Sequence, residues 1–496
     1  MDRVKTGVLG LDEILSGGLP ARGNYLLLGP PGSGKTTMGL QFLLEGVRHR
    51  EKCLYLSMAE SHGQLKVTAE SFGWRLDGID VYEMRHRGRS IGDRDRAGYS
   101  VFSPSEVELE EIFREIVEQI EKVQPSRLVL DSLSEIRMLA ADPFRYRREL
   151  LGLNDQLADH ACTSWFVDVV ASASDINAAE TIVNGVLILE NILPAYGGDR
   201  RRLHLRKLRG SRSVGGYHDF SIGDTGVEVY PRLVTTSHGA AHSSAAVPSG
   251  VSELDALLGG GLDGGTSTLL MGAAGTGKST VAAQFVAANA ARGERAAIFC
   301  FDESPTNLLI RTNSLGIPLA EHVKEGKVEL IPVETTEYSP GRLSDRIRRL
   351  VDEGVRVVIL DSVNGYMNAL PEERLLSAHL HELLAFLAER GTATILTLAE
   401  RGLFSATQDA AVNISSVADT VVLFRYFEWA GVVKQAISVV KKRTGKHERS
   451  IRELSFGPRG LDIGPPLTRM QDILSGRPRY VDVEGAQVGG KGDSDG

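Results

Sequence analysis

Residues 26–37 read LLLGPPGSGKTT, and residues 269–280 read LLMGAAGTGKST. Both contain G-x-x-x-x-G-K-[ST] after an apolar run, a glycine-rich turn whose backbone N–H groups surround phosphates at the positive end of the following helix. The lysine brings a positive charge next to the β- and γ-phosphates, and the Ser or Thr offers a hydroxyl to Mg²⁺. We therefore predict two nucleotide sites. Their predicted phosphate-binding residues are Gly29, Gly32, Ser33, Gly34, Lys35, Thr36 and Thr37 in the first loop and Gly272, Gly275, Thr276, Gly277, Lys278, Ser279 and Thr280 in the second.

The two loops are parts of a longer internal repeat. Residues 5–37 align without a gap to residues 248–280, with 15 of 33 positions identical. The similarity continues to residues 126–135 and 356–365, which read SRLVLDSLSE and RVVILDSVNG. Such self-similarity indicates a duplicated domain. The predicted organisation is a domain at residues 1–234, a small and polar linker at 235–247, a second domain at 248–476 and a disordered tail at 477–496.

Each half alternates short apolar runs with amphipathic stretches. Runs such as residues 25–28, 54–57 and 128–130 are rich in branched or aromatic residues, which predicts buried strands. Residues 107–123 carry apolar side chains at spacings of three and four, which predicts a helix. Alternating strands and helices indicate an α/β fold, in which each half is a mainly parallel twisted sheet flanked by helices.

Acidic residues follow a later strand in both halves. Asp131 comes directly after RLVL, and Asp361 comes directly after VVIL. A carboxylate at that position completes the metal site in many phosphoryl-transfer proteins. We therefore predict that Thr36 and Asp131 hold Mg²⁺ in the first half and that Ser279 and Asp361 hold it in the second. The alternative is that each aspartate only caps a helix.

Hydrolysis also requires a carboxylate that orients or deprotonates the attacking water. The second strand of each half ends in candidates for this role. Glu60 follows Ala59 in the first half, whereas the second half carries Asp302 and Glu303. We predict that these three carboxylates are catalytic, with solvated surface positions as the alternative.

The composition excludes several classes of protein. Fifty-six Lys and Arg against 64 Asp and Glu give a net charge of −8, so no overall basic field exists to hold nucleic acid. The local basic stretch at residues 85–96 is interpreted as a solvated loop, with a phosphate or partner contact as alternatives. The three cysteines are too few and too scattered for a disulfide framework. We expect no signal peptide or membrane span, and a cytoplasmic protein.

These features together resemble the KaiC family of RecA-like P-loop ATPases. The resemblance rests on T-G-x-x-x-L-D-x-x-L-x-G-G-L at residues 6–19, both phosphate loops, the acidic residues after the second strand, the Asp-Ser strand ends and the tandem arrangement. It covers about residues 1–476. It implies a homohexameric double ring with ATP bound between neighbouring subunits, and it makes signalling or clock-type proteins candidate partners. Clock partners are not carried over, because much of the chain looks closer to the broad bacterial KaiC-like ATPases.

The resemblance also implies residues that act across subunits. Lys207 and Arg209, and likewise Lys441 and Arg443, match a K-x-R pair that contacts the nucleotide phosphates of the adjacent subunit. Such a cation neutralises charge that develops during phosphoryl transfer. The alternative is a solvated basic strand end.

In clock members of the family the second domain phosphorylates itself. Residues 413–420 (NISSVADT) match that phosphosite stretch and place Ser415 and Ser416 at the acceptor positions. The resemblance thus implies a serine/threonine autokinase, in which Asp302 and Glu303 serve as base and support for the attacking hydroxyl. Ala410 replaces a third acceptor of the clock members, and two adjacent serines before a strand are also common without phosphorylation.

The leading functional hypothesis is therefore a KaiC-like, Mg²⁺-ATP-dependent ATPase and autokinase. A nucleotide-switched signalling scaffold with little turnover is the second hypothesis, because Ala59 leaves the first half with one carboxylate. A DNA-dependent RecA-like recombinase is the third, and the acidic net charge argues against it.

Overall fold

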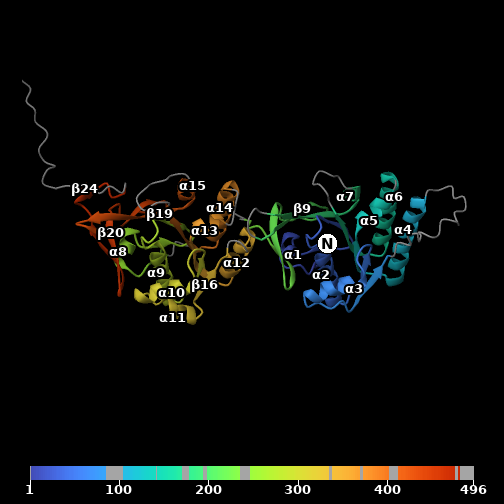
Figure 1. The fold of residues 1–496 in the computed structure, drawn as a ribbon, viewed down its shortest axis with the longest axis horizontal. Helices are drawn as coiled ribbons and strands as arrows, with labels where there is room; N and C mark the ends of the chain where they lie inside the picture. Colours follow the sequence, from blue (N-terminus) through green and yellow to red (C-terminus); the bar gives the residue numbers. More distant parts are fainter. Residues whose placement is uncertain are drawn as a thin grey trace, which may run out of the picture. The chain divides into compact units, whose positions relative to one another are not determined.

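The structure is a computed structural model, described over residues 2–84, 104–140, 142–169, 178–193, 198–234, 246–334, 338–368, 373–400, 411–474 and 479–480. The chain divides into two compact units, residues 1–232 and 233–496, and Figure 1 labels many of their elements. Every helix within the described ranges is too short or too polar to cross a lipid bilayer.

The first unit is built on one nine-stranded sheet in the order β11-β10-β9-β8-β3-β7-β6-β4-β5. The strands from β8 to β5 are parallel, and β9, β10 and β11 extend the sheet in antiparallel fashion. Short strands β1 (Arg3–Val4) and β2 (Leu19–Pro20) pair separately. The nine strands are β3 (Asn24–Gly29), β4 (Cys53–Ser57), β5 (Ile79–Glu83), β6 (Arg127–Asp131), β7 (Thr163–Val169), β8 (Gly185–Ile192), β9 (Arg200–Leu208), β10 (Tyr217–Gly223) and β11 (Gly226–Tyr230).

Helices cover both faces of this sheet because successive side chains of a buried strand point to opposite sides. Tyr25 and Leu27 of β3 pack with α1 (Leu11–Ile14), α2 (Lys35–Arg48) and α3 (His62–Ser71). Leu26 and Leu28 pack on the other face. The helices of that second face are α4 (Pro104–Val123), α5 (Leu133–Leu139), α6 (Pro143–Asp159) and α7 (Ala178–Ile182).

The second unit repeats this topology. Its sheet runs β16-β15-β17-β18-β14-β19-β20-β21-β22, with β16 to β19 parallel and the rest antiparallel. The strands are β14 (Ser267–Gly272), β15 (Arg295–Cys300), β16 (Val328–Pro332), β17 (Val355–Asp361), β18 (Ala393–Ala399), β19 (Thr420–Trp429), β20 (Val432–Lys442), β21 (Arg452–Gly457) and β22 (Gly460–Pro466). The helices are α8 (Ser252–Leu257), α9 (Lys278–Ala291), α10 (Pro305–Ser314), α11 (Leu319–Lys324), α12 (Pro340–Asp352), α13 (Val363–Asn368), α14 (Glu373–Glu389) and α15 (Ala411–Val417). The predicted fold class, two tandem RecA-like domains with mainly parallel sheets, is confirmed.

The structure differs from the sequence expectations at two boundaries. The last two residues of the expected linker form β12 (Ala246–Val247), which pairs with β13 (Leu262–Asp263) inside the second unit. Two residues of the expected disordered tail form β24 (Arg479–Tyr480), paired with β23 (Met470–Gln471). In both places backbone pairing holds residues whose composition alone suggested no structure. The rest of the linker, residues 235–245, and of the tail lie outside the described residues.

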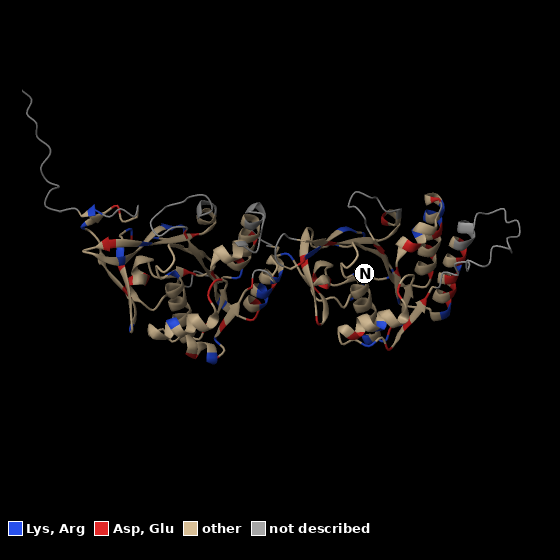
Figure 2. Cartoon of the chain, in the orientation of Figure 1, with Lys and Arg blue, Asp and Glu red and all other residues tan. Residues whose placement is uncertain are grey.

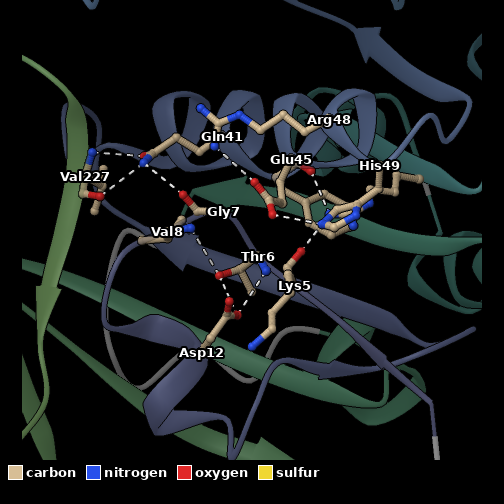
Figure 3. A network of polar contacts seen from close by, with 12 residues as sticks. Lys5, Thr6, Gly7, Val8, Asp12, Gln41, Glu45, Arg48, His49 and Val227 are labelled. Atoms are coloured by element: carbon tan, nitrogen blue, oxygen red, sulfur yellow. Dashed lines mark hydrogen bonds and ion pairs between the residues drawn. The ribbon is translucent and has the colours of Figure 1, made fainter.

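The opening motif of the first half is structural (Figure 3). The Asp12 carboxylate accepts hydrogen bonds of 2.9 Å from both the backbone N and the hydroxyl of Thr6, at the start of α1. Gln41 of α2 donates to the carbonyls of Gly7 and Val227 and accepts from the Val227 N–H. The motif therefore fixes the helix that begins at the phosphate loop against the first segment of the chain and β11.

Candidate nucleotide-binding sites

The first glycine-rich loop joins the carboxyl end of the central strand β3 to α2. Gly32 and Gly34 have φ angles of 74° and 90°, a region that favours glycine. A Cβ on Gly34 would lie 2.8 Å from Cδ1 of Ile222. Gly34 is also the N-cap residue of α2, and no side chain caps this helix. The first N–H groups of α2 are therefore directed at the loop, where an anion binds well.

The second loop has the same construction between β14 and α9. Gly275 and Gly277 have φ angles of 80° and 96°, and Gly277 is the uncapped N-cap of α9. A Cβ on Gly277 would lie 2.2 Å from the ring of Phe456. Thr276 donates to the Ala273 carbonyl at 2.8 Å, whereas the buried hydroxyl of Ser33 in the first loop has no protein partner. Both loops thus present backbone amides and leave little room for side chains.

The loop lysines fold back over their own loops. Lys35 Nζ donates to the carbonyls of Gly29 and Pro30 at 2.8 and 2.7 Å, and Lys278 Nζ donates to those of Gly272 and Ala273 at 2.9 and 2.7 Å. Both lysines are buried. Burial lowers the pKa of Lys35, and it lowers the pKa of Lys278 to about 8, against smaller raising effects of nearby carboxylates. Each ammonium is thus a desolvated cation that an anion in the loop would stabilise.

The predicted metal residues meet in both units. Thr36 Oγ1 donates to Asp131 Oδ2 at 2.9 Å, and Ser279 Oγ donates to Asp361 Oδ1 at 2.9 Å. A hydroxyl and a carboxylate oxygen at the phosphate loop are the chemistry that suits Mg²⁺, which keeps several waters when protein ligands are few. A cluster of three or more His, Cys, Asp or Glu suited to a metal ion is absent from the described ranges. The donor set therefore fits a phosphate-bound Mg²⁺ rather than a metal held by protein alone.

Each aspartate has a further hydroxyl partner that the sequence reasoning missed. Tyr55 of β4 donates to Asp131 Oδ2 at 2.6 Å, and Thr397 of β18 donates to Asp361 Oδ1. The two hydroxyls come from different strands, so alignment of the halves does not reveal them. The sequence signal that could have identified both residues was a polar side chain within a buried strand. Each hydroxyl holds its aspartate in one orientation. Burial raises the pKa of Asp361, and the hydroxyl groups bonded to it oppose this rise.

The predicted catalytic carboxylates lie beside the metal candidates because β4 and β15 end next to β6 and β17. Met58 N–H donates to the Asp131 carbonyl, and Phe301 N–H donates to that of Asp361. Burial first, and then the Asp131 carboxylate, raise the pKa of Glu60 above its usual value. In the second unit both carboxylates have partners: Asp302 accepts from the Ser362 hydroxyl, and Glu303 pairs with Arg311.

The K-x-R pairs lie at the opposite edge of each sheet, where the parallel strands begin rather than end. Lys207 pairs in register with Val186, which lies opposite Leu26, three residues before the end of β3. At about 3.3 Å per residue the phosphate loop begins about 10 Å further along. Lys207 Nζ instead donates to the carbonyls of Glu180 and Val183 at 2.8 and 2.7 Å, at the end of α7.

The second unit repeats this arrangement with the predicted phosphoacceptors. Lys441 pairs with Val421 near the start of β19, and its Nζ donates to the carbonyls of Ser415 and Ala418 at the end of α15 at 2.8 and 2.6 Å. Arg443 donates to the Ser416 carbonyl at 2.8 Å, and Arg209 donates to the Thr181 carbonyl at 3.2 Å. Ser416 is exposed and Ser415 is half-buried. The acceptor serines and the K-x-R pair therefore share one edge, away from the phosphate loop of their own chain.

Charged residues of both signs are interspersed over each unit in Figure 2. The predicted basic loop at residues 85–96 lies outside the described residues. The net charge of −8 disfavours a nucleic-acid surface.

Comparison with protein families gives a match over most of the chain. The family model described as "ATPase: KaiC" matches residues 4–234 and 247–468, one copy in each unit.

Comparison with curated proteins gives relatives of the same kind. The chain is 27% identical over 492 residues to the circadian clock protein KaiC3 of Synechocystis sp., covering 97% of this chain and 95% of that relative. It is 29% identical over 520 residues to the circadian clock oscillator protein KaiC of Picosynechococcus sp., covering 98% and 94%. It is 28% identical over 517 residues to the KaiC of Synechococcus elongatus, covering 97% and 92%.

Proposed function

Because the chain belongs to the KaiC family of ATPases, we propose that it hydrolyses Mg²⁺-ATP at two sites, assembles as a homohexamer through them, and phosphorylates its own second unit. The observation that carries this proposal is the separation of each K-x-R pair from the phosphate loop of its own sheet. Because each pair lies about 10 Å along the sheet from its own phosphate loop, we infer that it acts on the nucleotide of a neighbouring copy. A closed ring of identical copies satisfies every such contact.

In the first unit, the residues divide the chemistry of hydrolysis among them. The loop amides and Lys35 would bind the β- and γ-phosphates, and Thr36 and Asp131 would hold Mg²⁺, which would offset phosphate charge. Glu60 accepts a proton from the attacking water, whose oxygen bonds to the γ-phosphorus as the bond to the ADP oxygen breaks. Tyr55 keeps Asp131 oriented through its 2.6 Å hydrogen bond.

We expect Glu60→Gln to lower phosphate release from the first site by about 10²–10⁴-fold, the usual contribution of a general base. The measurement uses full-length protein in which Asp302→Asn and Glu303→Gln silence the second site. Glu60 must be ionised to accept a proton, and its pKa is raised. First-site turnover should therefore fall on acidification at a higher pH than an ordinary glutamate would give, and the glutamine variant should lack this acid limb.

Glu70→Gln is the matched control, because Glu70 lies on the adjacent helix α3 with 59% of its side chain exposed. It should leave both the rate and its pH dependence unchanged. Equal turnover in the Glu60→Gln variant and its parent would instead favour the nucleotide-switched scaffold, the candidate that Ala59 supports. That scaffold retains ATP without releasing phosphate and presents a surface to signalling or clock-type partners.

The second unit would transfer the γ-phosphoryl group to a serine of the neighbouring copy. A serine Oγ attacks the γ-phosphorus, ADP leaves, and an acidic residue of the pair Asp302 and Glu303 takes the hydroxyl proton. Ser415 and Ser416 share an edge with Lys441 and Arg443. A K-x-R pair that contacts the neighbour's phosphates would therefore bring the acceptor serines close to the same phosphates.

We expect γ-labelled ATP to label Ser415 or Ser416, with the label found by peptide mapping. Lys278→Ala should abolish labelling because the second site then no longer holds the nucleotide. Ser415→Ala with Ser416→Ala should abolish it while nucleotide binding persists. Ser314→Ala, an exposed serine at the end of α10, should leave it intact. Label that survives the double serine variant would reject these acceptors.

A further inference from the structure

One guanidinium joins three elements of the second site. Arg311, in the last turn of α10, places Nη2 at 2.5 Å from Oε2 of Glu303 and Nε at 3.4 Å from Oε1. Its remaining Nη1 donates to Thr280 Oγ1 at 2.6 Å. Thr280 directly follows Ser279, the hydroxyl bonded to Asp361. Arg311 therefore ties Glu303 to the first turn of the helix that begins at the phosphate loop.

The first unit lacks this connection. Both helices begin after a capping serine, Ser61 for α3 and Ser304 for α10. Arg311 lies seven positions after Ser304, and the residue seven positions after Ser61 is Thr68. A threonine at this position cannot form a forked ion pair with a carboxylate. The two sites therefore differ in a charged residue that no shared motif contains.

Glu303 and Asp302 are held in different ways. Glu303 has both oxygens directed at one guanidinium, and its side chain is 31% exposed. Asp302 accepts a hydrogen bond from the Ser362 hydroxyl, a neutral donor beside Asp361. A carboxylate whose two oxygens both accept from one guanidinium has fewer free lone pairs directed at an attacking group than a carboxylate that accepts from a single hydroxyl.

We propose that Arg311 is a positioning residue of the second site, which holds Glu303 as an ion pair beside Thr280 and leaves Asp302 to accept the proton of the attacking group. This inference rests on the proposed function. The first site, with Thr68 and Glu60, uses its glutamate directly. The two proposed phosphoryl-transfer sites thus use different bases: Ala59 leaves Glu60 as the one carboxylate of the first site, and in the second site Arg311 pairs with Glu303 and leaves Asp302.

The test compares pH profiles of phosphate release in full-length protein. In a Glu60→Gln background, which leaves the second site active, Arg311→Ala removes a cation and leaves Glu303 as an uncompensated neighbour of Asp302. The acid limb of turnover should move to higher pH, and the rate should fall about tenfold as positioning is lost. Arg311→Lys keeps the charge without the fork, so the limb should stay near its original pH.

The reciprocal variant introduces the arginine–glutamate pair into the first site. In an Asp302→Asn, Glu303→Gln background, Thr68→Arg should pair with Glu60 and move the acid limb of first-site turnover to lower pH. Arg295→Ala, which removes a surface pairing with Glu353 at the start of β15, is the matched control and should move neither limb.

The outcomes separate the two proposals. Turnover whose acid limb is unmoved by both Arg311→Ala and Thr68→Arg rejects the positioning role, even if Arg311→Ala lowers the melting temperature. Absence of phosphate release from both single-site backgrounds rejects hydrolysis itself, and the positioning role with it.

Discussion

We expect replacement of Lys35 and Lys278 together by alanine to remove tight ATP binding, and each single change to remove binding at one of the two proposed nucleotide sites. Each ammonium makes two charge-assisted hydrogen bonds to its own loop in the absence of ligand. A bound nucleotide replaces these with bonds to phosphate oxygens. Because a hydrogen bond to a charged group contributes about 1.5–3 kcal/mol, loss of two of them weakens affinity by at least about 10²-fold.

The stoichiometry of nucleotide binding by equilibrium dialysis checks this expectation. Lys122→Ala, at an exposed lysine in the last turn of α4, should leave two nucleotides bound. Because both loop lysines are buried, each variant also needs a thermal unfolding curve to show that it remains folded. A folded double variant with unchanged nucleotide affinity would overturn the assignment of both sites.

The same lysines predict how affinity depends on pH. Burial lowers the pKa of Lys278 to about 8 in the absence of ligand. The phosphates bind the ammonium and not the neutral amine, so binding is linked to proton uptake above that pKa. Affinity of the second site, measured in the Lys35→Ala variant, should therefore fall as pH rises beyond about 8.

The sequence was sufficient to predict the fold and those candidate site residues that belong to short local motifs. The loop pattern, the repeat and the alternation of apolar runs predict two parallel sheets because these features depend on local spacing. The pairing of Thr36 with Asp131 was predictable because both follow parallel strands, whose carboxyl ends share one edge. The same argument places Glu60 next to them.

Contacts between distant elements were not predictable in this way. Tyr55 and Thr397 each bond one of the aspartates predicted to hold the metal, yet they come from different strands and have no common motif. Arg311 reaches back across eight residues to Glu303 and across 31 to Thr280. These contacts depend on helix phase and side-chain direction. Backbone pairing likewise decided that residues 479–480 are structured, against their polar surroundings.

Removing the K-x-R cations of the second unit should nearly abolish second-site turnover. A trans arginine contributes about 10³–10⁵ to phosphoryl transfer in systems that use one. Burial first, and then the neighbouring Arg443, lower the pKa of Lys441, against a smaller raising effect of Asp419, which also pairs with Arg443 at 3.5 Å. We expect Lys441→Ala with Arg443→Ala to lower turnover by about 10³-fold in the Glu60→Gln background. Lys324→Ala, at an exposed lysine in the last turn of α11, is the control.

Coexpression of two inactive subunits distinguishes action across subunits from a local effect on α15. One subunit carries Lys278→Ala and keeps its K-x-R pair; the other carries Lys441→Ala with Arg443→Ala and keeps its nucleotide. If the cations act on the neighbour, random mixing in a ring makes about a quarter of the second-site interfaces complete, and turnover returns in proportion. If Lys441 and Arg443 only support the carbonyls of Ser415, Ser416 and Ala418 in their own chain, no mixture recovers activity, because neither subunit then contains a complete site.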